Sequence, residues 1–361
     1  DIKTAEFGLS CPIIRQPCFL HCSNLESIKI GSGDEKYWAE SATACPASSV
    51  GGYATKDGVL YSGDQKILKK YPEGKKDEIF IVPASVTNLA DYCFANAKFR
   101  VLGFEGDAPE MGEHVFDSCA VEVVYRTKNG KGFDAEFART PVFALDDVSD
   151  LSFAIDALDF VSHSEVSGNY TWTYRYMLEG GVEIGYYDNG FVWHRAIEPA
   201  PVGELSIPTQ LGGRTVSSVG YTAFENCAGL VKVTVPPSVR EIGTCAFIGA
   251  TALREVVFSE GLETIGVQAF LGCSSLSAVT IPASVTEVAS DAFLWCDSLT
   301  SFAVATGSGT YKAIDGVLYS ADGSTLVCCP CGYDRSEVPI PYGVKVIAED
   351  AFNGVARYAA H

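Results

Sequence analysis

Apolar residues recur with a period of 23 positions along the second half of the chain. The dipeptide Ala-Phe marks each unit and stands at Ala223-Phe224, Ala246-Phe247, Ala269-Phe270 and Ala292-Phe293. A leucine follows six residues after each Phe. Apolar residues three and five positions beyond that leucine have the spacing of a short strand that points alternate side chains inward. Each unit therefore predicts a short strand, a turn, a second extended piece and a return segment that contains Ala-Phe.

A single unit of 23 residues buries too few apolar side chains to offset the conformational entropy that it loses on folding. Units that stack on one another pair strand with strand and bury their Leu, Phe and Cys columns against the next unit. The period therefore predicts a solenoid built from short parallel strands.

The first half of the chain repeats the pattern of the second half. Residues 53–94 match residues 311–352 without a gap, and the segment DGVLYS stands at the same place in both. In the second copy VLYSADGSTLV (317–327) predicts a hairpin with a Gly-containing turn. The phrase PASVT also occurs twice, at 83–87 and 282–286. A sequence segment that recurs indicates a structural repeat rather than a catalytic motif, so we expect the chain to hold two arrays of such repeats.

A different pattern separates the two arrays, over about residues 141–200. Here NYTWTYRYMLEGGVEIGYYDNGFVWHRA (169–196) alternates strictly, with Gly-Gly and Asn-Gly turns, and predicts a meander of antiparallel strands. One face carries four aromatic residues, Tyr170, Trp172, Tyr174 and Tyr176. Because the first turn of a solenoid exposes an apolar end, we expect this segment to cap the second array. Whether the aromatic residues pack in the cap or form a platform for a sugar or peptide stays open.

The repeat columns LxxVxIPxSVxxIGxxAFxxCxxL resemble the BspA-like leucine-rich repeats, which are found mainly in surface proteins of host-associated bacteria and some protists. The segments that carry the resemblance are LREVVFSEGLETIGVQAFLGCSSL (253–276) and LSAVTIPASVTEVASDAFLWCDSL (276–299). The resemblance is strict over about 205–304, good over 311–355 and looser over 18–140.

Together these patterns predict a right-handed leucine-rich-repeat solenoid, rich in β-structure with short parallel strands. We expect three parts: an N-terminal array over 1–140, an antiparallel β linker or cap over 141–200, and a C-terminal array over 201–361.

The cysteines follow the repeat rather than a disulfide framework. The chain has 13 Cys, an odd number, and Cys227, Cys273 and Cys296 all stand three residues after a repeat Phe. Because Cys behaves as a small apolar residue and is often buried, the column predicts reduced thiols stacked one turn apart. A disulfide framework is the alternative.

The segment CCPC, with Cys328, Cys329 and Cys331, is the one cluster in the sequence that suggests a metal site. It lacks a fourth ligand, and the equivalent positions in the first array are Lys70, Tyr71 and Glu73. Free thiols are the favoured interpretation, with a local disulfide and a metal site as alternatives, so we predict no metal and no cofactor.

The charge of the chain limits its partners. The net charge is −19 and the pI is about 4.6, which argues against nucleic acid and against anionic lipid as partners. There is no apolar run of membrane-spanning length, so no membrane insertion is predicted. The chain opens at Asp1 without a signal peptide, and we expect a mature or trimmed fragment.

No catalytic motif stands out in the sequence. There is no GxSxG elbow, no GxGxxG after a strand and no P-loop, and none of the five His pairs with another ligand at metal-binding spacing. We therefore expect a protein that is not an enzyme.

The outward positions of the repeat strands are the candidate binding residues. In the C-terminal array the predicted outer residues are Lys232, Thr234, Glu255, Val257 and Thr280, with Ala278, Ser301 and Ala303 beside them. This stripe is small, flat and nearly neutral, which suits weak or multivalent contact better than a deep pocket. The second candidate surface is the aromatic pair Trp172 and Tyr174.

The resemblance implies a non-enzymatic cell-surface or secreted module that binds protein or mediates adhesion, with a host or matrix protein or a glycan as its partner. Two alternatives stay open. One is a structural spacer that displays another domain. The other is an enzyme domain grafted on the repeats, with its chemistry carried by the CCPC thiols or the aromatic meander.

Overall fold

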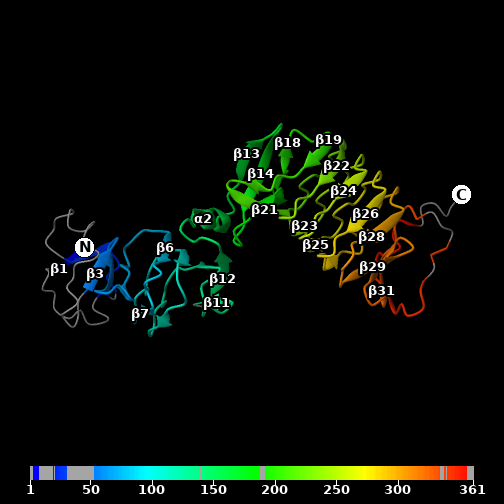
Figure 1. The fold of residues 1–361 in the computed structure, drawn as a ribbon. Helices are drawn as coiled ribbons and strands as arrows, with labels where there is room; N and C mark the ends of the chain where they lie inside the picture. The colour runs from blue at the N-terminus through cyan, green and yellow to red at the C-terminus, as the bar shows by residue number, and fades with distance from the viewer. Residues whose placement is uncertain are drawn as a thin grey trace. The chain divides into compact units, whose positions relative to one another are not determined.

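The regular secondary structure of the chain is almost entirely short β-strands, which are joined by turns and irregular segments (Figure 1). The structure is a computed structural model that describes residues 3–7, 19, 21–30, 53–137, 140–187, 192–333, 337–338 and 340–355. By its internal contacts the chain divides into two compact units, Asp1–Ile155 and Asp156–His361. Within the described residues the structure has one α-helix, α2 (Ser152–Leu158).

Two parallel ladders of strands run through the first unit. One ladder contains β6 (Ile79–Val82), β8 (Val101–Phe104), β10 (Val123–Thr127) and β12 (Thr140–Leu145), with β11 (Glu136–Phe137) antiparallel to β12. The other contains β5 (Ile67–Lys70), β7 (Asn88–Leu89) and β9 (Glu110–Met111). A separate parallel pair joins β1 (Thr4–Phe7) to β2 (Ser27–Ile30). Each turn of the chain contributes one strand to each main ladder, which is the arrangement of a solenoid.

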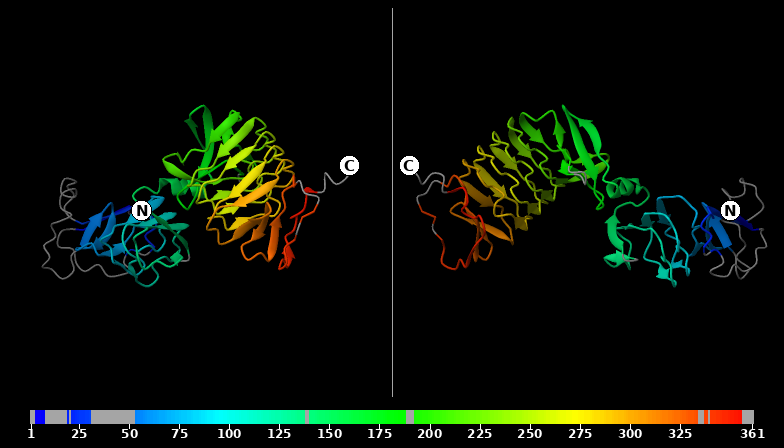
Figure 2. Two further views of the ribbon diagram at one scale, coloured as in Figure 1. Left: turned by 45° about the vertical axis from the view of Figure 1, so that its right-hand side comes forward. Right: turned by 180° about the vertical axis from the view of Figure 1, so that it is seen from behind.

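The second unit has the same two-ladder design with stricter spacing. The first ladder has two hydrogen-bonded parts. One contains β19 (Gly203–Ser206), β22 (Leu230–Thr234) and β24 (Glu255–Val257), and the other contains β26 (Ala278–Ile281) and β28 (Ser301–Val304). The second contains β21 (Arg214–Val219), β23 (Glu241–Ile242), β25 (Thr264–Ile265) and β27 (Glu287–Val288), with β20 (Gln210–Leu211) antiparallel to β21. Figure 2 shows the stacked turns from two sides.

Strand register confirms the solenoid that the period predicts. Lys232 pairs with Glu255, and Ile242 pairs with Ile265, so partners in neighbouring strands are 23 residues apart in both ladders. Parallel strands of one solenoid face each other at equivalent positions because each turn has the same length.

The predicted hairpin is present in both units with the same register. In the second unit β29 (Tyr311–Ile314), β30 (Val317–Ser320) and β31 (Thr325–Cys328) form an antiparallel sheet, and β32 (Val346–Ile347) joins β31 in parallel. In the first unit β3 (Tyr53–Lys56), β4 (Val59–Ser62) and β5 pair in the same way, with β7 parallel to β5. The hairpin is therefore a variant turn that each array uses once among the described residues.

A stack of phenylalanine rings forms the centre of the second unit. The rings of Phe224, Phe247, Phe270 and Phe293 lie parallel, with centroids 4.8, 5.0 and 5.2 Å apart and interplanar angles of 6° or less. These distances are close to the separation of neighbouring strands. The return segments are also joined by backbone hydrogen bonds, in which Phe247 N–H donates to Ala269 O and Phe270 N–H to Ala292 O. The rise from one turn to the next therefore permits both ring stacking and backbone hydrogen bonding between the return segments.

The return segments are irregular although Ala and Phe tolerate a helix. The residue two places after each repeat Phe has a left-handed backbone, at Asn226, Gly249, Gly272 and Trp295. Asn and Gly enter this region at little cost, and it ends any helical turn. The chain therefore leaves the Phe column in a tight turn and reaches the next strand within the 23-residue period.

The meander between the arrays belongs to the second unit. It contains β13 (His163–Ser167), β14 (Tyr170–Tyr176) and β15 (Val182–Ile184), and β14 pairs antiparallel with each of the other two. On its other side β15 pairs in parallel with β21, the first strand of the second ladder. The Trp172 ring contacts Phe224 edge to face, with centroids 6.4 Å apart. Trp172 thus covers the first ring of the phenylalanine stack.

The last described turn of the second unit leaves apolar side chains exposed. Ile347 is 50% exposed, whereas its equivalent in the first unit, Leu89, is 2% exposed. The difference arises because β7 of the first unit is followed in its ladder by β9, while β32 has one neighbour, β31, among the described strands. Burial of these columns depends on the next turn rather than on the turn itself.

We expect Phe270→Ala to lower the free energy of unfolding by about 3–5 kcal/mol, because it removes one of the two inner rings of the stack and leaves a cavity between the neighbouring turns. Chemical denaturation of the purified chain measures the change. Val267→Ala is the matched control, since Val267 lies in the same turn and is 48% exposed. A loss below about 1 kcal/mol for Phe270→Ala would contradict the role given to the stack.

Candidate functional site

The outer face of the first ladder in the second unit is the first candidate site. Its strands alternate, so that Val233, Val256, Val279 and Phe302 point into the core and are buried. The predicted outer residues Lys232, Thr234, Glu255, Val257 and Thr280 are exposed or half-buried, as strand alternation requires. We call the surface formed by the outward residues of β22, β24, β26 and β28 the outer strand face.

Neighbouring strands bring these residues side by side. Lys232 lies opposite Glu255, and Thr234 lies opposite Val257. Lys232 Nζ is 2.9 Å from Glu255 Oε1, and this hydrogen bond raises the pKa of Lys232. The pair neutralises its own charge, so the outer strand face offers small, flat and mostly uncharged side chains to a partner.

The aromatic pair of the second candidate surface lies inside the protein. Trp172 is 2% exposed and Tyr174 is 4% exposed, and both belong to the core of the second unit. Burial raises the pKa of the Tyr174 hydroxyl to about 12, with a smaller contribution from Tyr176. The position of these residues is the one expected for cap packing, and an open platform for a ligand would need their faces exposed.

Trp172 is also one of the residues that line a shallow hollow of about 310 Å³. Asn169 and Tyr170 contribute one wall, and Glu204 and Ser206 of β19 contribute another. Because β19 is the first strand of the ladder that carries the outer strand face, this hollow lies where the cap meets that ladder.

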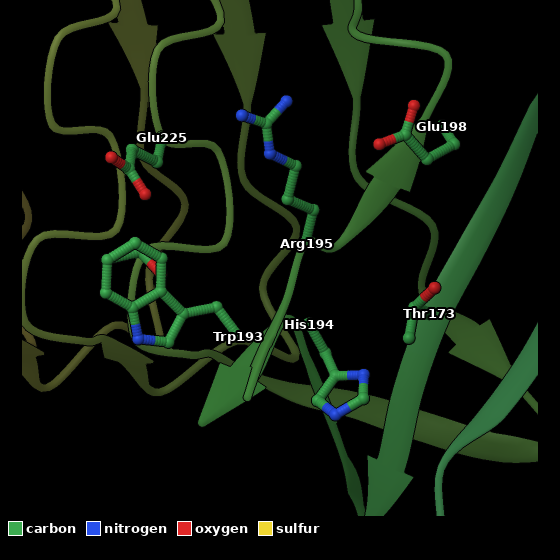
Figure 3. A pocket seen from close by; sticks show the side chains of 7 residues that line it. Thr173, Trp193, His194, Arg195, Glu198 and Glu225 are labelled. Carbon is green, nitrogen blue, oxygen red and sulfur yellow. The ribbon is translucent and has the colours of Figure 1, made fainter. Parts of the chain in front are cut away.

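A larger hollow of about 420 Å³ opens on another side of the cap (Figure 3). It is lined by Thr173, Trp193, His194, Arg195, Glu198, Thr222 and Glu225. We call it the cap pocket. Its residues come from β14, from β17 (Trp193–His194) and β18 (Ile197–Glu198), and from the return segment of the first array turn.

Sequence patterns missed the cap pocket. The segment that contains Trp193 and Arg195 continues the alternating meander, so it predicts no more than further cap strands. In the structure Trp193 is 57% exposed, in contrast to the buried Trp172. The one sequence feature that marks this region is the end of the alternating pattern at Arg195-Ala196, between β17 and β18.

Hydrogen bonds and ring contacts hold the walls of the cap pocket in place. Ala196 N–H donates to Ala223 O at 2.9 Å, and Ala196 O accepts from Thr173 N–H at 2.9 Å. The His194 ring stacks on Tyr186 with centroids 4.6 Å apart. The segment from Trp193 to Glu198 therefore acts as an extra return segment that joins the meander to the first array turn.

The cysteines of the described residues all carry free thiols. The column residues Cys227, Cys273 and Cys296 are buried, and so are Cys328, Cys329 and Cys331. This confirms the predicted thiol column and places the CCPC thiols in the core, while Cys11, Cys18 and Cys45 lie outside the described residues. No group of three or more potential ligands within the described part of the chain is arranged to hold a metal ion.

Burial makes these thiols poor nucleophiles. It raises the pKa of Cys273 and of Cys329 to about 12, and it raises that of Cys296 well above its usual value. A thiol reacts as its thiolate, so thiols that are protonated at neutral pH are unsuited to covalent catalysis. The structure thus disfavours an enzyme whose chemistry is carried by the CCPC segment.

The first unit fills the places of Cys328 and Cys331 with an ion pair. Lys70 Nζ is 3.3 Å from Glu73 Oε1, and both side chains are buried. Lys70 also donates to the carbonyl oxygens of Tyr92 and Ala95, and Glu73 accepts from the backbone N–H of His21. The fold accepts either thiols or charges here because each polar group has a partner.

Six copies of the BspA type leucine rich repeat region match residues 73–134 and 204–313. These segments are BspA-type leucine-rich repeats. The match covers part of each array and confirms the resemblance seen in the repeat columns.

Several solved structures are similar to parts of the chain. A leucine-rich repeat protein from Eubacterium ventriosum is 21% identical over 54% of this chain and 57% of its own, with a TM-score of 0.35. One from Bacteroides capillosus is 28% identical over 39% of this chain and 98% of its own, with a TM-score of 0.32. The pneumococcal vaccine antigen PcpA is 20% identical over 54% of this chain and 62% of its own, with a TM-score of 0.30.

The chain thus spans little more than half the length of the Eubacterium ventriosum structure. No curated protein matches the sequence. Among the described residues the search for a helix long and apolar enough to cross a membrane finds none.

Thiol labelling tests the burial of the column cysteines. With N-ethylmaleimide at pH 8 we expect Cys273 and Cys296 to stay unmodified in the native protein, because burial keeps both thiols protonated and out of reach. After denaturation without reductant, mass spectrometry should find most cysteines labelled. Thr280→Cys provides the control, since Thr280 is exposed on β26 and its replacement should label rapidly in the native state. Pairing of twelve cysteines in disulfides would refute the thiol column.

Proposed function

We propose that the chain is a non-enzymatic, protein-binding module of a cell-surface or secreted protein, with adhesion to a host or matrix protein as its role. The observation that carries this proposal is the outer strand face, on which successive turns place short outward side chains and the one Lys–Glu pair neutralises itself. Repeat solenoids bind proteins through extended surfaces of this kind.

The composition of the outer strand face supports contact with a protein rather than with a small molecule. Thr234, Val257, Thr280 and Ala303 present short side chains that lose little rotamer freedom when a partner covers them. The face lacks large aromatic anchors among its outward residues, so affinity would come from many weak contacts over several turns.

The charge of the chain restricts the class of partner. At a net charge of −19 the protein repels other strongly acidic molecules at long range, which favours neutral or basic protein surfaces. The neutral outer strand face then allows close contact without burial of unpaired charge.

Location at the cell surface rests on the repeat family. BspA-like repeats occur mainly in surface proteins, and the resemblance of this chain to them supports a surface or secreted location. A non-enzymatic role is supported by the protonated core thiols and by the repeat scaffold itself.

Binding to a panel of immobilised matrix proteins at physiological salt tests the proposal. We expect at least one saturable interaction that the double variant Val257→Lys and Thr280→Lys weakens about tenfold or more, because two unpaired charges would be placed in the interface. Thr264→Lys is the control, since Thr264 lies between Glu241 and Glu287 in the other ladder.

Binding that survives the double variant unchanged would show that the outer strand face is not the interface. Absence of any interaction across the panel would favour a structural spacer. Unfolding midpoints of the three proteins, measured in parallel, separate a lost interface from a lost fold.

A further inference from the structure

The cap pocket combines an exposed aromatic ring with charged side chains of both signs. A single exposed Trp is not unusual on a protein surface. Trp193, however, borders a hollow of about 420 Å³, a size within the range of small-ligand sites, and the backbone around it is anchored by the hydrogen bonds of Ala196. The pocket is thus formed before a ligand arrives.

The charged residues of the cap pocket keep hydrogen-bonding capacity that a ligand can use. Arg195, Glu198 and Glu225 all line the pocket, and in the view of Figure 3 the Arg195 guanidinium is drawn between the two carboxylates. Within the described part of the chain Arg195 makes no ion pair with either of them. Glu225 accepts one hydrogen bond, from Asn226 Nδ2 at 3.1 Å, which leaves carboxylate lone pairs available.

This arrangement selects against ligands of high charge. An anion drawn to Arg195 would share the pocket with the carboxylates of Glu198 and Glu225, and a cation drawn to these carboxylates would share it with the guanidinium. A neutral ligand with several hydroxyl groups suffers neither repulsion. Hydroxyl groups donate to carboxylates and accept from a guanidinium, so adjacent hydroxyls can satisfy Arg195 and Glu198 at the same time.

We propose that the cap pocket binds a neutral pyranose unit of a glycan. The apolar C–H face of the ring packs on the Trp193 indole, and its hydroxyls bond to Arg195, Glu198 and Glu225. The side-chain hydroxyls of Thr173 and Thr222 are further hydrogen-bonding groups in the lining. This site goes beyond the proposed protein-binding function, because none of its residues lies on the outer strand face.

A glycan array with the full chain tests this proposal. The array carries neutral glycans that end in hexoses or N-acetylhexosamines, together with sialylated glycans and glycans that end in free amino sugars. We expect binding to neutral glycans, weaker or no binding to the charged ones, and a loss of about tenfold or more in affinity for Trp193→Ala and for Arg195→Ala.

Trp295→Gly provides the matched control for the loss of an exposed Trp. Trp295 is half-exposed, and the equivalent positions in the two preceding turns hold Gly249 and Gly272 with the same left-handed backbone. This variant should keep both its fold and its glycan affinity. The double variant of the outer strand face should also keep its glycan affinity, which separates this test from that of the proposed function.

Three results would overturn the proposal. They are the absence of binding to every neutral glycan, binding that Trp193→Ala and Arg195→Ala leave unchanged while both variants keep the melting temperature of the parent protein, and a preference for charged glycans over neutral ones.

Discussion

The stacking of equivalent residues one turn apart is the interaction on which the second unit depends. Each phenylalanine ring lies parallel to the next at about 5 Å, and the same rise lets the return segments exchange backbone hydrogen bonds. Because rings, return segments and strands all need a similar spacing, a change in the length of one turn would disturb all three. The fixed period of 23 residues is the sequence counterpart of this constraint.

The first ring of such a stack has no preceding turn to cover it, so other residues must do so. At the start of the second array Trp172 covers Phe224, and the segment around Ala196 supplies the backbone partner that a preceding turn would otherwise provide. The cap therefore makes the ring contact and the backbone hydrogen bond that a repeat turn would make, although its sequence does not follow the repeat. Since its strands do not follow the repeat, hollows form where cap and array meet, and both pockets described above lie there.

Two kinds of surface result from this design. The outer strand face is repetitive, nearly neutral and extended, which suits a partner with a broad surface. The cap pocket is formed once, from residues of several segments, and has an exposed indole with charged groups of both signs. A repeat surface offers many weak contacts, whereas a hollow at a junction can select a small chemical unit, so the two surfaces suit different partners.

The sequence by itself determined the period, the buried columns, the paired hairpins and the outward position of residues such as Thr234 and Thr280. These features depend on residues within one turn or one strand, so their spacing can be seen directly in the sequence. It could not decide that Trp172 is buried and Trp193 exposed, because both belong to one alternating segment. That difference arises where β14 packs on Phe224 and β17 pairs with β16 (Tyr186–Tyr187) at the rim of the pocket. Only the tertiary structure brings Thr173, Arg195 and Glu225 together, since contacts between segments that do not repeat have no period to reveal them.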